Sequence, residues 1–293
     1  MNRIFILAEN GQLGWELCRT LAPLGEIIAV DYPKINLEYP ENVCEMVRDL
    51  KPNLVVNAAA YTAVDRAETE RERARKINAI APGLLAEECK SLGAMFVHYS
   101  TDYVFDGSKG SLYVESDLTN PLSVYGESKL EGEQLVQAAG GAYLIFRTSW
   151  VYSMRGQGGF ISKVLQWSRQ QETLRMVTDQ IGNPTWARML AEATAQIVAR
   201  GQDHVTEHAG LYHLAGSGFA SRFEWAKKIL ELDPNINEQI TKEILPARTA
   251  DFPTPAVRPL FSALDCSKFE STFNLRLPYW ETALRLALQY ETP

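Results

Sequence analysis

The chain has 293 residues, of which 46% are hydrophobic and 22% charged, a composition typical of a globular protein with a sizeable core. Its formal net charge of −7 and pI near 5.3 argue against a broad nucleic-acid-binding surface, although a few local arginines can still hold an anionic small molecule. The four cysteines are far apart and lack CxxC or metal-ligand spacing, which is typical of reduced thiols in a cytosolic protein.

No segment reads as a targeting signal or a membrane span. The first apolar run, IFILA, breaks off at Glu9 and is too short for the apolar region of a signal peptide. No apolar stretch approaches the length that a membrane helix requires. We therefore expect a cytoplasmic monomer or homodimer with no membrane partner and no nucleic-acid partner.

The first half of the chain alternates short apolar runs with helical patterns. Runs that are apolar on both faces, as in a buried parallel sheet, lie at 3–8, 26–31, 53–60, 94–101 and 142–149. Helical patterns lie between them, at 13–22, 41–50, about 65–92 and 124–139. This alternation predicts right-handed β–α–β units, and hence an α/β fold with a Rossmann-like, doubly wound parallel sheet.

A glycine-containing turn joins the first apolar run to the first helix. In ILAENGQLGWEL, Gly11 and Gly14 stand where a backbone can approach a pyrophosphate, ahead of a helix N-terminus that favours phosphates. Ala8 replaces the first glycine of the usual pattern, which it can do if its φ stays negative or if the turn is adjusted. Asp31 ends the second run, where an acid can bind the ribose hydroxyls of an adenosine and favours NAD over NADP; Lys34 could soften that preference. The alternative is a plain structural turn followed by a turn acid.

Tyr125 and Lys129 stand four positions apart in a helical segment, so they share one face. We expect the lysine ammonium to lower the pKa of the phenol, about 10 in a free tyrosine, toward the range of acid–base catalysis. Ser128 and Gly132 on the same stripe would leave room for a flat ring such as nicotinamide. A solvated helix face is the alternative, because Y-x-x-x-K often occurs by chance.

Ser100, Thr101 and Asp102 end the fourth apolar run. Ligands of doubly wound sheets bind outside the carboxyl ends of the strands, so these residues should lie near the tyrosine and the lysine. Such a set suits hydride transfer to a ketone. The hydroxyl polarises the carbonyl oxygen, the tyrosine protonates it, the lysine positions the ribose, and a nicotinamide cofactor supplies the hydride. The sequence thus predicts an oxidoreductase.

After Trp150 the alternation of strand and helix patterns becomes less regular. Residues 179–185 are rich in turn residues, and residues 250–259 are rich in proline, which excludes a regular helix or a central strand there. Helical patterns follow at 187–199 and 279–290. No clean linker divides the chain. We expect residues 1–150 to form mainly a dinucleotide-binding domain and 151–293 mainly a smaller, interleaved substrate-binding lobe, with some elements returning to the sheet.

Four further residues admit two interpretations. Trp150 can face the site or fill the core. Arg147 and Arg258 can bind a diphosphate in bidentate fashion or serve as structural partners. We interpret His98, inside the fourth run, as an interior histidine rather than a catalyst.

Seven segments together resemble one family: NGQLGWEL, VNAAAYTAVDRAE, HYSTDYVFDG, PLSVYGESKLEGE, FRTSWVY, DQIGNPT and PTPAVRP. Through them the chain resembles the extended short-chain dehydrogenase/reductase superfamily, and within it the dTDP-4-dehydrorhamnose reductase family, over nearly its whole length. The resemblance implies reduction of the 4-keto group of dTDP-4-dehydro-L-rhamnose by NADPH or NADH, giving dTDP-L-rhamnose. The alternatives are a reductase of another nucleotide-linked 4-ketosugar and a non-catalytic NADP-binding regulatory subunit like the beta subunit of methionine adenosyltransferase.

The resemblance also implies roles for individual residues. The catalytic set would be Tyr125, Lys129 and Thr101. The cofactor would contact Tyr125 and Lys129 and also Gly11, Gln12, Leu13, Asp31, Asn36, Leu37, Ala60, Tyr61 and Thr62. The dTDP-sugar would contact Thr101, Asp102, Tyr103, Trp150 and Arg258.

Two positions depart from the family pattern. Asn36 stands where an aspartate is common near the adenine. Some members join a dimer through magnesium held by carboxylates; Glu16 could serve here, but Arg188 stands where a second glutamate is expected. A cation in the place of a cation ligand argues against that bridge, so we expect no catalytic metal.

Overall fold

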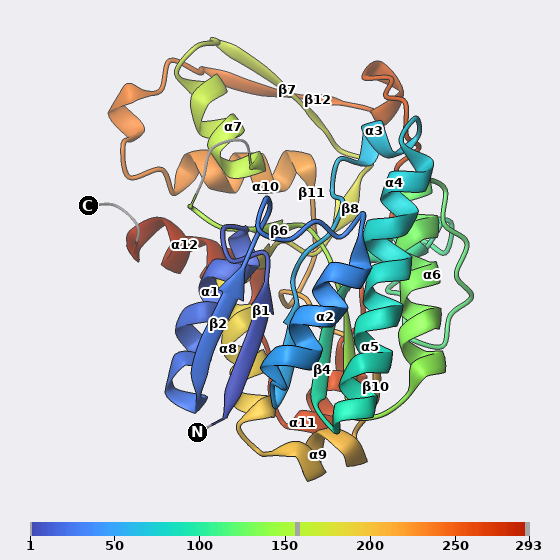
Figure 1. Ribbon diagram of the computed structural model, residues 1–293. Helices are drawn as coiled ribbons and strands as arrows, with labels where there is room; N and C mark the ends of the chain where they lie inside the picture. Colours follow the sequence, from blue (N-terminus) through green and yellow to red (C-terminus); the bar gives the residue numbers. More distant parts are fainter. Residues whose placement is uncertain (1, 156–158, 291–293) are drawn as a thin grey trace.

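The computed structural model describes residues 2–155 and 159–290, which form an α/β fold around a six-stranded sheet (Figure 1). The strands are all parallel, in the order β10-β5-β4-β3-β1-β2. Their bounds are Arg3–Leu7 for β1, Glu26–Val30 for β2, Leu54–Asn57 for β3, Met95–Thr101 for β4, Tyr143–Thr148 for β5 and Gly210–His213 for β10. The predicted doubly wound parallel sheet is confirmed.

Helices cover both faces of this sheet because successive strand residues point to opposite sides. In β1, Ile4 and Ile6 pack into one apolar core, whereas Phe5 and Leu7 pack into the other. The first core is closed by α1 (Gln12–Thr20), α8 (Ala187–Val198), α9 (Gln202–Glu207) and α11 (Ser267–Phe273). The second is closed by α2 (Pro40–Leu50), α5 (Ala81–Leu92) and α6 (Val124–Ala139).

The strand order places a crevice at the carboxyl ends of the central strands. From β1 the chain crosses to β2 on one side, then returns to β3 on the other side. The connections after these strands therefore diverge, and their diverging loops leave a space outside the strand ends where ligands of such sheets bind.

A third apolar core lies above these strand ends and joins residues from the second half of the chain. It is built on buried Trp225, Trp280 and neighbouring aliphatic residues. The helices are α7 (Phe160–Ser168), α10 (Arg222–Glu231) and α12 (Trp280–Tyr290). Three two-stranded sheets accompany them: β7 (Thr173–Val177) with β12 (Glu243–Ala247), β8 (Ile181–Gly182) with β11 (Ala220–Ser221), and β6 (Val151–Tyr152) with β9 (Thr185–Trp186). β10, by contrast, completes the large sheet.

The helix expected at about 65–92 is divided. It consists of α3 (Val64–Ala67), α4 (Arg71–Arg75), a π-helical turn (Lys76–Ile80) and α5. The side chain of Asn78 in the π turn bonds the backbone N–H and carbonyl of Tyr61 and the hydroxyl of Ser128. The wider π-helical turn thus points the Asn78 side chain toward α6. Such turns often occur at functional sites. Short 3₁₀ turns occupy Ala22–Leu24, Asp102–Val104, Ile236–Glu238 and Thr249–Asp251.

Within the described ranges, no helix combines the length and the apolar character needed to cross a membrane.

Candidate active site

A cavity of about 740 Å³ lies at the carboxyl ends of β1, β3 and β4 and extends to α10. Most of the residues expected at a site line it: Gly11, Gln12, Leu13, Asp31, Ala60, Thr62, Thr101, Asp102, Tyr103, Tyr125, Lys129 and Trp150. These residues come from six separate stretches of the chain. The fold therefore gathers the expected glycine turn, hydroxyl, phenol and lysine around one cavity.

The glycine turn is tight, and its geometry excludes one of the two alternatives for Ala8. Ala8 has φ +69°, not a negative value. It therefore takes the left-handed conformation that the usual glycine at this position would adopt freely. Its carbonyl oxygen would lie 1.9 Å from a Cβ on Gly14, so only glycine fits there. Asp31 holds the turn from the other side, because its carboxylate accepts hydrogen bonds from the N–H of Asn10 (2.9 Å) and of Tyr32 (2.7 Å). The cavity is thus open beside the start of α1, where backbone N–H groups are free.

Tyr125 lies in the first turn of α6, whose start is fixed by the Ser123 hydroxyl accepting a bond from the N–H of Gly126 (3.2 Å). Its ring meets that of Tyr103 edge to face, with centroids 5.6 Å apart. Burial raises the pKa of the Tyr125 phenol above its usual range, and the nearby Thr101 hydroxyl offsets this only in part. The expectation of a lowered pKa is therefore wrong for this structure, since Lys129 is not among the groups that shift it.

Lys129 is almost fully buried and is held by the fourth strand. Its Nζ donates to the backbone carbonyl of Tyr99 (2.6 Å) and lies 3.2 Å from Nε2 of His98. Burial lowers the pKa of Lys129 to about 8. His98 is completely buried and also contacts the Asn57 amide at 3.2 Å, in agreement with the interior role expected for it.

Ser128 and Gly132 do not face the cavity, contrary to the expectation that they make room for a cofactor ring. A Cβ on Gly132 would lie 2.1 Å from the carbonyl oxygen of Asn78, and Ser128 bonds the Asn78 amide (3.0 Å). The small residues of this stripe therefore let α6 approach the π-helical turn. This packing leaves Tyr125 and Lys129 as the members of the stripe that reach the cavity.

Asp102 is buried among hydroxyl groups. Its carboxylate accepts hydrogen bonds from Ser262, Ser149 (3.0 Å) and Thr101 (3.2 Å). Burial raises the pKa of Asp102, and these hydroxyls oppose the shift. Because Thr101 also accepts a bond from the N–H of Tyr103 (3.2 Å), its hydroxyl oxygen is held in place at the end of β4, while the O–H bond can still rotate.

Five candidates lie outside the cavity lining. Leu37 belongs to the second apolar core, Tyr61 is 9% exposed, and the Asn36 side chain accepts a bond from the N–H of Glu38 (3.0 Å). Arg258 pairs with Asp65 (2.8 Å), although its charge reaches Tyr103. Arg147 is buried in an ion pair with Glu133 (2.7 Å), so its structural interpretation is the one that the geometry favours.

Arg222 lines the cavity but was not singled out in the sequence. A capping box starts α10, in which Ser221 Oγ accepts from the N–H of Glu224 (3.1 Å) and the Glu224 carboxylate accepts from Ser221 N–H (2.7 Å). Arg222 follows as the first helical residue. Its guanidinium lies 3.6 Å from the ring centroid of Trp150, a residue with φ +44°. Burial lowers the pKa of Arg222 to about 10, and none of the described carboxylates pairs with it in a salt bridge. The capping box is visible in the sequence, but the approach to Trp150 is not.

The chain matches a family model described as the RmlD substrate binding domain over residues 1–292. It is 41% identical over 293 residues to a dTDP-4-dehydrorhamnose reductase of Burkholderia thailandensis, covering 98% of both chains. A solved dTDP-4-dehydrorhamnose reductase from Clostridium acetobutylicum superposes with a TM-score of 0.89 at 35% identity, covering 98% of each chain. Another solved dTDP-4-dehydrorhamnose reductase, from Bacillus anthracis in complex with NADP, superposes with a TM-score of 0.89 at 32% identity, covering 100% of both chains. With full-length agreement in sequence and in fold, the chain belongs to the dTDP-4-dehydrorhamnose reductase family.

Proposed function

We propose that this protein reduces the 4-keto group of dTDP-4-dehydro-L-rhamnose with NADPH or NADH, giving dTDP-L-rhamnose for deoxysugar-nucleotide synthesis. The observation that carries the proposal is the meeting of the Thr101 hydroxyl, the Tyr125 phenol and the Lys129 ammonium at one wall of the cavity, beside the glycine turn. Family membership makes this substrate the first one to test.

The residues present fit a dinucleotide. The close contact between Gly14 and the Ala8 carbonyl brings the start of α1 against the end of β1, which leaves its N–H groups for a pyrophosphate. Small side chains follow β3, at Ala58, Ala59 and Ala60 along the cavity. When bound, the nicotinamide supplies the hydride.

The protein's own side chains would supply a proton to the keto oxygen of the substrate and would hold that carbonyl group in position. The pKa of a free tyrosine, about 10, already lies above neutral pH. Burial raises the pKa of Tyr125 further, so its phenol is protonated and can donate to the keto oxygen as negative charge develops there. The Thr101 hydroxyl, positioned by Asp102 and by the N–H of Tyr103, can turn its proton to the same oxygen. Lys129, fixed to the Tyr99 carbonyl, would orient the ribose.

Arg222 and Trp150 would hold the substrate on the opposite side of the cavity. Trp150 would border the hexose, and Arg222, which stacks on the Trp150 ring, offers a guanidinium suited to bidentate contact with a diphosphate. Arg258 would assist only if it released Asp65. Since Arg222 begins a helix of the third core, this arrangement supports 151–293 as mainly the substrate-binding lobe.

The test is loss of the reduced cofactor's absorbance with dTDP-4-dehydro-L-rhamnose, in the wild type and in Tyr125→Phe. We expect the variant to lose turnover by about 10²- to 10⁴-fold, the usual contribution of a general acid, while its cofactor affinity in a fluorescence titration is retained. Tyr103→Phe is the matched control, since it removes a phenol from the same cavity and should keep kcat within about tenfold, less than one general acid contributes.

Two outcomes would favour the alternatives. A wild type that oxidises the cofactor only with other nucleotide-linked 4-ketosugars would assign a different substrate. A wild type that binds the cofactor but oxidises it with no ketosugar would favour a regulatory subunit.

A further inference from the structure

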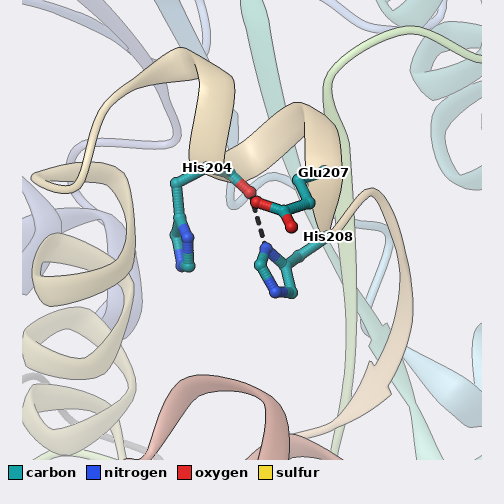
Figure 2. Close-up of side chains that lie close together, drawn as sticks. All are labelled: His204, Glu207 and His208. Carbon is teal, nitrogen blue, oxygen red and sulfur yellow. Dashed lines mark hydrogen bonds between the residues drawn. The ribbon is translucent and has the colours of Figure 1, made fainter.

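Three potential metal ligands lie together on α9 and at the residue that caps it, away from the cavity. His204, Glu207 and His208 each offer one ligand atom, and these atoms lie within 4.8 Å of one another (Figure 2). Their spacing of three and four positions puts them on one side of the helical turn. Because α9 precedes β10, the cluster lies at the amino end of the parallel sheet, opposite the strand ends that border the cavity (Figure 1).

The His208 ring is held through one of its two nitrogens. Its Nδ1 donates to the backbone carbonyl oxygen of His204 at 2.9 Å, because a carbonyl can only accept (Figure 2). In the neutral ring the proton is therefore on Nδ1, and the lone pair of Nε2 is free. Metal-binding histidines are commonly held in this way, with the second ring nitrogen bonded to a backbone carbonyl.

The His204 ring has unused bonding capacity. Its Nε2 is buried with no hydrogen-bond partner, and within 2–155 and 159–290 no protein group bonds its Nδ1 either. The two imidazoles lie with centroids 4.4 Å apart and planes tilted by 44°, and both contact the fully buried ring of Phe273. Phe273 thus forms a fixed wall that keeps the pair together.

The surrounding charges roughly balance. Glu207 is exposed and brings a carboxylate, and Asp203 lies on the same helix. The positive charge of Arg200 disfavours a bound cation, but the Arg200 guanidinium donates a 2.7 Å hydrogen bond to the backbone carbonyl oxygen of Phe273. A carboxylate as third ligand would neutralise half the charge of a divalent ion.

We propose that His204, Glu207 and His208 bind a divalent transition-metal ion, with Zn²⁺ as the preferred ion and water completing the coordination. Two imidazoles and one carboxylate match the nitrogen and oxygen donors that Zn²⁺ takes. Bonds of about 2.0–2.1 Å place neighbouring ligand atoms about 3.3 Å apart in a tetrahedral site. Rotation of the Glu207 and His204 side chains closes the remaining distance. The ion would clamp the last turn of α9 and take no part in the proposed reduction.

The sequence makes this site unusually testable. Of the four histidines in the chain, His98 and His213 are completely buried, so imidazole binding of added metal reports on His204 and His208. The competing soft ligands are the two partly exposed thiols of Cys18 and Cys266. A probe that distinguishes sulfur from nitrogen ligation separates them.

The experiment uses untagged full-length protein, treated with chelator and titrated with Zn²⁺ at pH 7.5 by calorimetry. We expect one ion per chain, and at least a tenfold loss of affinity in His208→Gln and in the double variant His204→Asn/His208→Gln. Glu207→Gln should weaken binding several-fold. Glu172→Gln is the matched control, because that exposed carboxylate lies far along the chain and pairs with Lys242.

A second measurement keeps the proposal falsifiable if a variant folds poorly. Co²⁺ bound to the wild type should show the d–d absorption of nitrogen and oxygen ligation without a thiolate charge-transfer band. No binding by the wild type at 100-fold molar excess of Zn²⁺, a thiolate spectrum, or equal affinity in the folded double variant would each overturn the site.

Discussion

The ammonium of Lys129 on α6 donates a 2.6 Å hydrogen bond to the backbone carbonyl oxygen of Tyr99 on β4. This bond joins the helix that carries Tyr125 to the strand that ends in Thr101. The three groups proposed for catalysis are therefore held by one contact between α6 and β4, and the lysine is oriented by the strand rather than by the phenol.

Replacing Lys129 with methionine should weaken the proposed reaction and the fold together. The variant keeps the length of the side chain but leaves the Tyr99 carbonyl without its donor, at a cost of about 1–3 kcal/mol. We expect a higher KM for the cofactor, a lower kcat/KM, and a lower urea midpoint. Lys163→Met, on the exposed face of α7, should change none of them. An unchanged cofactor KM would argue against a ribose contact.

Arg222→Ala should raise the KM for the dTDP-sugar while leaving kcat nearly unchanged, because a diphosphate contact is made equally in the ground and transition states. Hydrogen bonds to a charged group are worth about 1.5–3 kcal/mol, which corresponds to a KM higher by about 10- to 100-fold. Arg175→Ala removes a surface arginine paired with Asp251 and serves as control. A fall in kcat with constant KM would place Arg222 elsewhere in the mechanism.

Asp31→Asn should shift the cofactor preference toward NADPH. The carboxylate lines the cavity and would repel a 2′-phosphate, whereas the amide keeps an oxygen that can accept from the glycine turn. We expect the ratio of kcat/KM for NADPH over NADH to rise about tenfold, or about 1.4 kcal/mol. Asp49→Asn, on an exposed position of α2, is the comparison. A constant ratio would mean that the acid does not meet the adenosine ribose.

Gly14→Ala should disrupt the glycine turn, since the new Cβ would lie 1.9 Å from the Ala8 carbonyl oxygen. Forcing a methyl group into such a contact costs about 1–3 kcal/mol, so thermal stability and cofactor affinity should both fall. At Gly210 a Cβ meets nothing closer than 3.7 Å, and Gly210→Ala should be nearly neutral. Equal affinities for the cofactor in the two variants would contradict the proposed pyrophosphate position.

His213 should make the fold sensitive to acid. Burial, and then the charge of Arg147, lowers the pKa of His213 to about 3. An unfolded histidine titrates near pH 6.5, so between about pH 6.5 and 3 the unfolded chain binds a proton that the native ring does not. Native stability is therefore full above pH 6.5 and falls by about 1.4 kcal/mol per pH unit below it.

His213→Asn should reduce this slope in urea unfolding measured across that range. His98 contributes a slope of the same sign, because burial and Lys129 lower the pKa of His98 as well. The variant should thus retain part of the acid sensitivity. Identical slopes in the two proteins would show that His213 is not held neutral.

The apolar runs and the helical periods were sufficient to predict the sheet and its winding. Strands apolar on both faces can be buried only between two layers of helices, and short motifs at their ends must then meet at one edge of the sheet. For that reason the sequence alone predicts that the glycine turn, Thr101, Tyr125 and Lys129 belong to a common site.

Other properties depend on contacts between residues far apart in the chain. Packing that the local pattern does not encode produces three of them. These are the raised pKa of Tyr125, the three hydroxyls around Asp102 and the close contact of Gly132 with the Asn78 carbonyl. Arg222 is the clearest case, since 72 positions separate it from Trp150 and only the packing of α10 brings its charge over that ring. Local spacing is sufficient for secondary structure, whereas burial and long-range electrostatics are properties of the folded whole.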